Sequence, residues 1–190
     1  AATAPGEIVV NGWSPSKRNN PWANSGIVVS VNWDDIPEFH KFGPLAGLEF
    51  QKSVEQKCWE AGGKSQTAPA QRISDFIAKK KSTSLPSCSY TRGVQSANLS
   101  EVLPSAIYEC LAIAFEQFGK KMKGYYTHEA NVVGVESRTS SPVNIPRNDS
   151  LHHPEVINLF PCGEGGGYAG GIISAAMDGE RCAEAAAKEF

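Results

Sequence analysis

Long apolar runs are absent from this chain of 190 residues. Its apolar runs are a few residues long, such as the one at residues 27–29, whereas a membrane-spanning helix needs about 20 apolar residues. The sequence therefore predicts neither a membrane span nor the apolar core of a secretory signal. An excess of one charge is missing as well. With a formal net charge of −2, the overall electrostatics favour neither nucleic acid nor an anionic membrane as a partner.

Paired cysteines are also lacking. The five cysteines, Cys58, Cys88, Cys110, Cys162 and Cys182, are odd in number, widely spaced and without a C-x-x-C pair. This argues against a disulfide framework or a zinc site and favours an intracellular, reducing compartment, such as the cytoplasm or an organelle like the plastid stroma. The adjacent His152 and His153 are expected to be exposed, because neighbouring side chains point in different directions and do not form a metal site alone.

The most informative stretch lies near the C-terminus, where five of the seven residues from 165 to 171 are glycine. The short apolar run at 159–161, which precedes these glycines, is predicted to be the end of a buried strand. Residues 172–188 predict a helix with one face of mostly small residues that packs closely against a sheet, while Asp178 and other charged residues fall on the opposite, polar face. The residues predicted to be buried are Ile172, Ala175, Ala176, Gly179, Cys182, Ala183 and Ala186. A strand, a glycine loop and a helix together bring backbone N–H groups and a helix N-terminus up to an anionic or electron-rich ligand.

Together with the block at residues 136–147, the run PCGEGGGYAGGIISAAMDGERCAEA resembles the C-terminal flavin-binding segment of FAD-dependent oxidoreductases, often labelled FAD-dependent dehydrogenases. The resemblance implies that Glu164 bonds the ribityl chain of FAD. It places Arg138 beside the flavin or substrate, where its charge would pair with a carboxylate or act on the N1–C2=O edge of the flavin. The alternative that stays open is a surface ion pair of Arg138. The backbone expected to line the flavin comprises Gly163, Gly165, Gly166, Gly167, Gly170, Gly171 and Ile172.

The fold implied by the resemblance is mixed α/β (α+β). It is part of a glutathione-reductase-like FAD-binding domain with an inserted, mainly helical cap or substrate domain. Residues 1–43 and 131–190 would belong to the FAD-binding domain and residues 44–130 to the insertion. In such proteins an N-terminal βαβ unit carries the G-x-G-x-x-G loop that holds the FAD pyrophosphate, and the chain is expected to lack this unit. The glycines at 165–167 and 170–171 do not replace its loop, because no second strand with an acidic end follows them. A missing N-terminal half or a covering subunit is therefore the expected partner, within a larger assembly.

Two functions stay open. In the first, the chain is the C-terminal part of a flavin oxidoreductase, with hydride or electron transfer at the flavin N5 and no identifiable catalytic base. In the second, it is a non-catalytic accessory or scaffold subunit derived from such a protein. Cys162 would lie close enough to the flavin for redox chemistry, but it lacks a C-x-x-C partner, and a packed thiol is the preferred interpretation.

The remaining pattern predicts strands at residues 7–10, 26–31 and within 125–136. Helices are expected at residues 45–61, ending at Gly62-Gly63, at 69–79, and at 104–118, ending at Gly119. Residues 82–98 are expected to be an extended connection.

Overall fold

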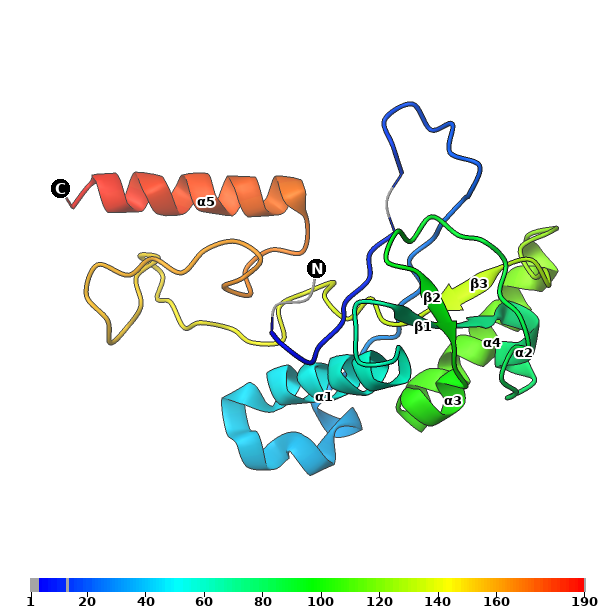
Figure 1. Cartoon of the computed structure of the whole chain (residues 1–190). Helices are drawn as coiled ribbons and strands as arrows, with labels where there is room; N and C mark the ends of the chain where they lie inside the picture. Colours follow the sequence, from blue (N-terminus) through cyan, green and yellow to red (C-terminus); the bar gives the residue numbers. More distant parts are fainter. Residues whose placement is uncertain (1–3, 13, 190) are drawn as a thin grey trace. The chain divides into compact units, whose positions relative to one another are not determined.

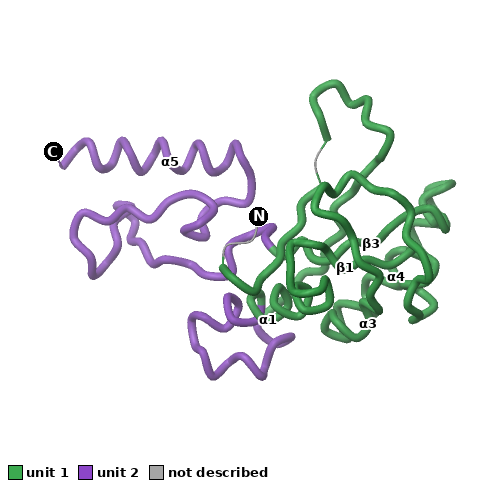
Figure 2. The backbone as a smooth tube through the Cα atoms, viewed as in Figure 1, with its two compact units in different colours: residues 1–32, 51–137 green, residues 33–50, 138–190 purple. Residues whose placement is uncertain are grey.

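The computed structural model describes residues 4–12 and 14–189, so the outermost residues of the two predicted flanking segments, 1–43 and 131–190, lie outside it. The chain divides into two compact units (Figures 1 and 2). Unit 1 comprises residues 1–32 and 51–137, and unit 2 comprises residues 33–50 and 138–190. The boundaries of these two units differ from those of the three predicted segments, 1–43, 44–130 and 131–190. The assignment of those segments to flavin and cap domains stays a prediction.

Unit 1 contains a three-stranded sheet in the order β2-β1-β3. The central strand β1 (Ala68–Arg72) pairs in parallel with β2 (Val94–Ser96) and antiparallel with β3 (Asn131–Val133). Four of its five residues are buried. Residues 69–72 were predicted to be helical, which is wrong, because strands from both sides take up their backbone hydrogen bonds.

Three helices form the core of unit 1 beside this sheet: α2 (Ile73–Ile77), α3 (Leu99–Val102) and α4 (Ser105–Lys121). The helix predicted at residues 104–118 is confirmed, and its Tyr108, Leu111 and Phe115 are buried at helical spacing. The ring of Phe76 lies edge-on to that of Phe115, with centroids 5.4 Å apart. This aromatic contact joins α2 to α4.

Helix α4 continues past the predicted stop at Gly119 and ends at Lys121. A Cβ at Gly119 would lie 2.5 Å from the Cβ of Tyr126, closer than two carbon atoms can approach. This glycine therefore allows the returning chain to pack on the helix rather than ending it.

Buried Gln71 ties β1 to both neighbouring helices. Its side-chain amide donates hydrogen bonds to the carbonyl oxygens of Asp75 (3.2 Å) and Lys80 (2.6 Å). Its Oε1 accepts the backbone N–H of Leu99 at 3.0 Å. Because Gln71 is 0% exposed, these contacts replace water at both ends of the amide.

Helix α1 (Ala46–Ala61) confirms the prediction for residues 45–61, including its end. Gly63 adopts φ +84° and donates its N–H to the carbonyl of Glu60 at 3.0 Å, a left-handed helix end that favours glycine. Before α1, the chain forms two 3-10 helices, η1 (Trp33–Asp35) and η2 (Pro37–Leu45).

Two predicted strands are not formed. Residues 7–10 are buried but not in a strand, although Val10 donates its N–H to Val135 at 2.9 Å. Residues 26–30 alternate as a strand would, with Ile27 and Val29 packed on the core and Val28 58% exposed, but Val31 breaks the pattern at 39% exposed. An extended backbone alternates its side chains whether or not it is paired, so the pattern predicted the conformation but not the pairing. The strand expected within 125–136 is reduced to β3.

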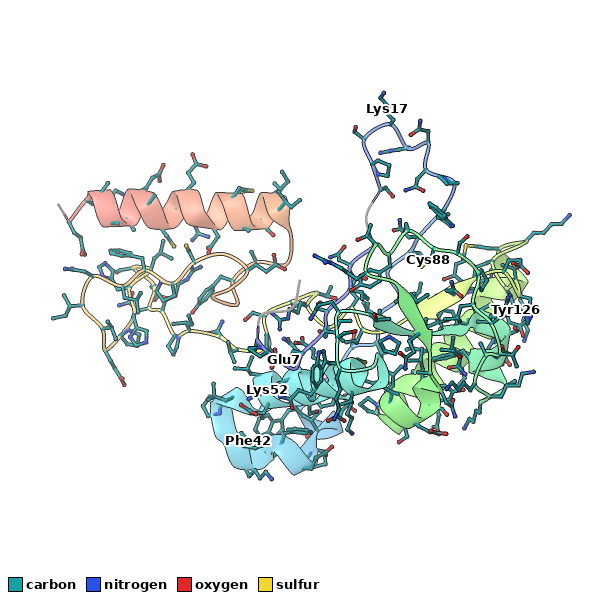
Figure 3. The ribbon with its side chains drawn as sticks, in the orientation of Figure 1. Glu7, Lys17, Phe42, Lys52, Cys88 and Tyr126 are labelled. Atoms are coloured by element: carbon teal, nitrogen blue, oxygen red, sulfur yellow. The ribbon has the colours of Figure 1, made fainter. Side chains whose placement is uncertain are left out.

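Figure 3 shows the side chains along the ribbon, with Lys17 on the loop that precedes residues 26–31 and Cys88 on the connection that leads to β2. That connection, predicted as extended over residues 82–98, contains the short strand β2 before α3 begins. Lys17 is exposed and Cys88 is half-buried.

In unit 2, the described residues 138–189 contain one helix, α5 (Ile172–Ala187), and no strand. The helix predicted at 172–188 is confirmed, but the strand expected at 159–161 and the sheet expected beneath the helix are not formed. Its buried residues are Asp178 and Cys182, whereas Ala176 and Ala183, predicted to be buried, are exposed.

The fold is thus a mixture of helices and a small sheet, as the α+β prediction required. None of the helices in the described residues is long and apolar enough to cross a membrane.

Replacing Gln71 with alanine should lower the free energy of unfolding by about 1–3 kcal/mol, because the buried N–H of Leu99 and the carbonyl of Lys80 would lose their hydrogen bonds to the Gln71 amide. Denaturant unfolding of the full chain measures the change. Gln95→Ala, on the exposed side of β2, is the matched control and should change stability little. Equal effects at both positions would contradict the role given to Gln71.

Candidate functional site

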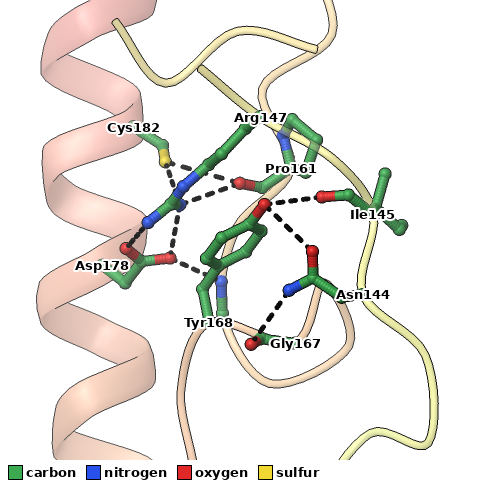
Figure 4. Close-up of polar contacts among 9 residues, drawn as sticks. Asn144, Ile145, Arg147, Pro161, Gly167, Tyr168, Asp178 and Cys182 are labelled. Atoms are coloured by element: carbon green, nitrogen blue, oxygen red, sulfur yellow. Dashed lines mark hydrogen bonds and ion pairs between the residues drawn. The ribbon is translucent and has the colours of Figure 1, made fainter. Parts of the chain in front are cut away.

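The glycine-rich loop from 163 to 171 is held by the segment at residues 141–147. The backbone N–H of Ile145 donates to Gly166 O at 3.1 Å, and Asn144 Nδ2 donates to Gly167 O at 3.3 Å. Tyr168 closes the loop, since its hydroxyl donates to Ile145 O at 2.7 Å (Figure 4). One side of the loop is therefore occupied by the chain's own backbone.

Arg147 connects this segment to helix α5. Its Nη2 lies 2.7 Å from Asp178 Oδ1 and its Nη1 lies 2.9 Å from Asp178 Oδ2, a two-pronged ion pair (Figure 4). Nη1 also donates to Pro161 O at 2.9 Å, and the guanidinium carbon lies 3.6 Å from the centre of the Tyr168 ring. The side chains of Arg147 and Asp178 are only 10% and 6% exposed.

Asp178 also binds the first residue of the loop. Its Oδ2 accepts the backbone N–H of Gly163 at 2.9 Å. The hydrogen bond from Arg147, with that from Gly163, lowers the pKa of Asp178 from 3.8 to about 2. The same hydrogen bond raises the pKa of Arg147. Both groups are thus charged at neutral pH, and helix, loop and upstream segment meet at one carboxylate.

Sequence reasoning missed this pair. The sequence pattern assigned Arg147 no role beyond being the last residue of the block at 136–147. Asp178 was predicted to lie on the polar face of the helix at 172–188. A signal was present, since Asp178 lies three residues after Ala175 and four before Cys182, on the same stripe as two predicted buried positions. A carboxylate within a stripe of small residues indicates a buried partner of opposite charge.

The loop glycines fall into two groups. Gly163 and Gly167 have φ of +67° and +84°, a conformation that side chains disfavour, and a Cβ at Gly167 would also lie 2.9 Å from Val143 O. A Cβ at Gly166 would lie 3.1 Å from Cys162 O. At Gly165 and Gly170, by contrast, a Cβ would have no atom within 4 Å and φ is not in the left-handed region. Neither strain nor contact with the described chain requires glycine there.

The N-terminus of α5 follows the loop without a side-chain cap. The N-cap residue is Gly171, which has no side chain that could cap the helix. The first turn also contains no acidic residue. The first N–H groups of a helix lack acceptors within it. The first residue, Ile172, is 89% exposed. This helix end could therefore donate hydrogen bonds to a group outside the described chain.

The two charged residues predicted for the site differ in their surroundings. Glu164 is exposed, and its backbone carbonyl accepts the N–H of Gly167 at 3.0 Å. Arg138 belongs to the same unit, is half-buried and already interacts with other groups. Whether either side chain contacts a flavin stays a prediction.

The histidine pair was predicted to be exposed, which is wrong, since both rings are half-buried. His152 Nε2 lies 2.7 Å from Glu189 Oε1, and its ring centre is 4.2 Å from that of Phe160. The two histidines and Glu189 border an open depression of about 460 Å³ that includes no loop residue. Across the described ranges, no three His, Cys, Asp or Glu residues are arranged to hold a metal ion.

The described chain therefore combines a fold of helices and a small sheet with a glycine loop that leads into an uncapped helix end. Residues 1–139 match the family described as "FAD-dependent protein, C-terminal domain-like", and the chain belongs to this family. The match includes Arg138 and ends before the glycine loop.

A protein from Clostridium beijerinckii, described only as an uncharacterized protein, is 42% identical over 192 residues, which cover 100% of this chain. The similarity therefore continues through the loop and α5. The chain spans 36% of the length of this curated relative.

Replacing Asp178 with asparagine should reduce the local stability of α5 by about 1.5–3 kcal/mol, the range for a hydrogen bond to a charged group. Because the pKa of Asp178 is lower in the folded state, its contribution is full above its ordinary pKa of 3.8. That contribution disappears as the pH falls toward about 2. Hydrogen exchange of α5 amides as a function of pH measures both effects.

Asp149→Asn, an exposed change in the same unit, is the control and should leave the exchange of α5 unchanged. If Asp178→Asn and the parent lost protection over the same acid range and to the same extent, the ion pair would not stabilise this helix.

Proposed function

We propose that the chain is the C-terminal part of a flavin-dependent oxidoreductase in which electrons or hydride are transferred at FAD. Membership of a FAD-dependent protein family supports the association with a flavoprotein. The observation that carries the proposal is the pair of glycines, Gly165 and Gly170, that the described chain itself does not require. A planar group that approaches the backbone at these two positions would require them.

The residues present fit a flavin. One side of the loop is hydrogen-bonded to residues 141–147, and the positions of Gly165 and Gly170 are open. The uncapped α5 N-terminus can donate N–H groups to the carbonyl oxygens of the flavin pyrimidine edge and favours negative charge there. The exposed carboxylate of Glu164 can accept hydrogen bonds from ribityl hydroxyls.

In this arrangement the flavin supplies the redox chemistry and the protein supplies position and electrostatics. Glu164 and the N–H groups at residues 171–173 orient the ring system. The Arg147–Asp178 pair holds the loop and the helix end in register by binding Gly163. Arg138 is proposed to lie beside the flavin or substrate, where its positive charge would favour an anionic group.

The adenosine and pyrophosphate of FAD would be bound elsewhere in the protein. Residues 165–170 have the G-x-G-x-x-G spacing, but the described residues around them form no βαβ unit, and the relative is considerably longer than this chain. We infer that the partner is this other half, in the same polypeptide or a second one, in an intracellular reducing compartment. Exposed apolar residues at the start of α5, Ile172, Ile173 and Met177, are 89%, 72% and 60% exposed, which suits burial against such a partner.

Purification of the full-length protein tests the proposal directly. A flavin absorbance band that remains through purification and is bleached by a chemical reductant is the expected result. Protein that stays colourless after incubation with FAD and is recovered only within a complex would instead favour the accessory-subunit function.

Replacing Glu164 with glutamine should weaken FAD retention in the full-length protein about tenfold, equivalent to ~1.4 kcal/mol, because an amide is a poorer acceptor for ribityl hydroxyls than a carboxylate. Released flavin fluorescence measures retention. Glu184→Gln, an exposed change on α5, is the control and should leave retention unchanged. Equal retention in both variants would remove Glu164 from the site.

Adding a methyl group at Gly165 or Gly170 should weaken FAD binding by about tenfold or more, because the new Cβ would hold the ring away from the backbone. Thermal unfolding without the cofactor should change little, since each Cβ enters open space. Gly179→Ala, likewise open but within α5, is the matched control. Gly167→Ala should instead destabilise the loop itself.

A loss of stability without cofactor at Gly165 or Gly170, equal to that at Gly167, would show that these glycines serve the loop conformation. Full FAD binding by both variants would exclude close approach of the ring at these positions.

A further inference from the structure

Two cysteines that are about 20 positions apart in the chain meet beside the Arg147–Asp178 pair. Cys162 lies between Pro161, whose carbonyl oxygen is 3.8 Å from Cys182 Sγ, and Gly163, whose N–H donates to Asp178 on the preceding turn of α5. Cys162 follows Pro161 at the start of the loop and is exposed, whereas Cys182 lies on α5 and is 3% exposed. The interpretation of Cys162 as a packed thiol is therefore wrong, and the partner missing from a C-x-x-C pattern is provided by the fold.

The surroundings of Cys182 suit a sulfur that changes state. Arg147 Nη1 lies 3.3 Å from Cys182 Sγ, and Pro161 O lies 3.8 Å from it (Figure 4). A guanidinium at this distance stabilises a thiolate, and the carbonyl accepts the proton of the thiol. Both contacts come from the segments that hold the glycine loop.

We propose that Cys162 and Cys182 are a redox-active dithiol that exchanges with low-molecular-weight disulfides and closes to an intramolecular disulfide. The proposal rests on contacts within unit 2 and does not depend on the flavin.

The two thiols have different tasks. Burial is the main cause that raises the pKa of Cys182, with Asp178 and Cys162 acting in the same direction and Arg147 opposing them. Cys182 is therefore a poor first nucleophile, and it is shielded from solvent. Cys162 is accessible, so it attacks the incoming disulfide, and Cys182 resolves the product.

The exchange balances in two steps. The Cys162 thiolate attacks one sulfur of a disulfide RSSR, forming a mixed disulfide and releasing one thiol RSH after protonation. The Cys182 thiolate then attacks the Cys162 sulfur, forming the Cys162–Cys182 bond and releasing the second RSH. The dithiol loses two electrons and two protons, and RSSR gains them.

Closure would affect the neighbouring loop. The new bond would enclose residues 162–182, which contain the entire glycine loop and the first part of α5. It would also remove the thiol proton donated to Pro161 O. The oxidation state of the pair is thus coupled to the positions of the loop and the helix end.

The other cysteines provide internal controls. Cys58 is buried, and burial together with Glu55 raises its pKa to about 12, so it stays protonated. Cys110 is exposed and Cys88 half-buried. Cys110 reports ordinary surface reactivity on the same protein.

The experiment equilibrates the full-length protein with glutathione buffers of increasing oxidised fraction, followed by acid quenching, differential alkylation and peptide mapping. Cys162 and Cys182 are expected to become protected together and to appear as one cross-linked peptide, with less than a tenth of Cys162 carrying glutathione. Cys110→Ser should leave this unchanged. Cys182→Ser should accumulate glutathione on Cys162 at least fivefold over the parent.

Cys162→Ser changes an exposed side chain and keeps the test valid if Cys182→Ser fails to fold. It should leave Cys182 reduced over the full range of buffers. Oxidation of Cys182 in that variant to the parental extent would overturn the proposal. Stable glutathionylation of parental Cys162 at the level of Cys110, with no cross-linked peptide, would overturn it as well.

Discussion

The ion pair between Arg147 and Asp178 is the interaction on which the arrangement of the glycine loop and α5 depends. Few apolar side chains are buried between residues 138 and 189, and no strand is formed there, so neither a hydrophobic core nor a sheet orients the glycine loop. Arg147 instead contacts Asp178, Pro161 and Tyr168 at once. Because removing charges from water is costly, each of these charges must be satisfied by the other and by nearby dipoles, which selects one arrangement of the segments.

The same pair links the two proposals. Asp178 binds the N–H of Gly163, at the beginning of the loop proposed to contact the flavin, and Arg147 lies 3.3 Å from the sulfur of Cys182. A change in the charge or bonding of that sulfur therefore acts on the group that positions the loop. The open positions of Gly165 and Gly170 lie on the part of the loop that this network leaves uncovered.

Local patterns predicted the helices well and the strands poorly. Helices α1, α4 and α5 were predicted within a few residues, because the pattern that marks each helix lies within one continuous segment. The central strand β1 has the sequence APAQR and weak strand propensity. It is extended because β2 and β3, more than 20 residues away in the chain, hydrogen-bond to both of its edges.

The amino-acid sequence alone determined the positions of the main helices, the glycine-rich loop before α5 and the relationship to FAD-dependent proteins. Tertiary structure decided which polar and sulfur-bearing residues meet: Arg147 with Asp178, 31 residues apart, and the two residues flanking Cys162 with the part of α5 that carries Asp178 and Cys182. The physical reason is that a charged residue on a helix has the same local pattern whether it faces water or a buried counter-charge. Only a second segment, brought close by folding, distinguishes the two.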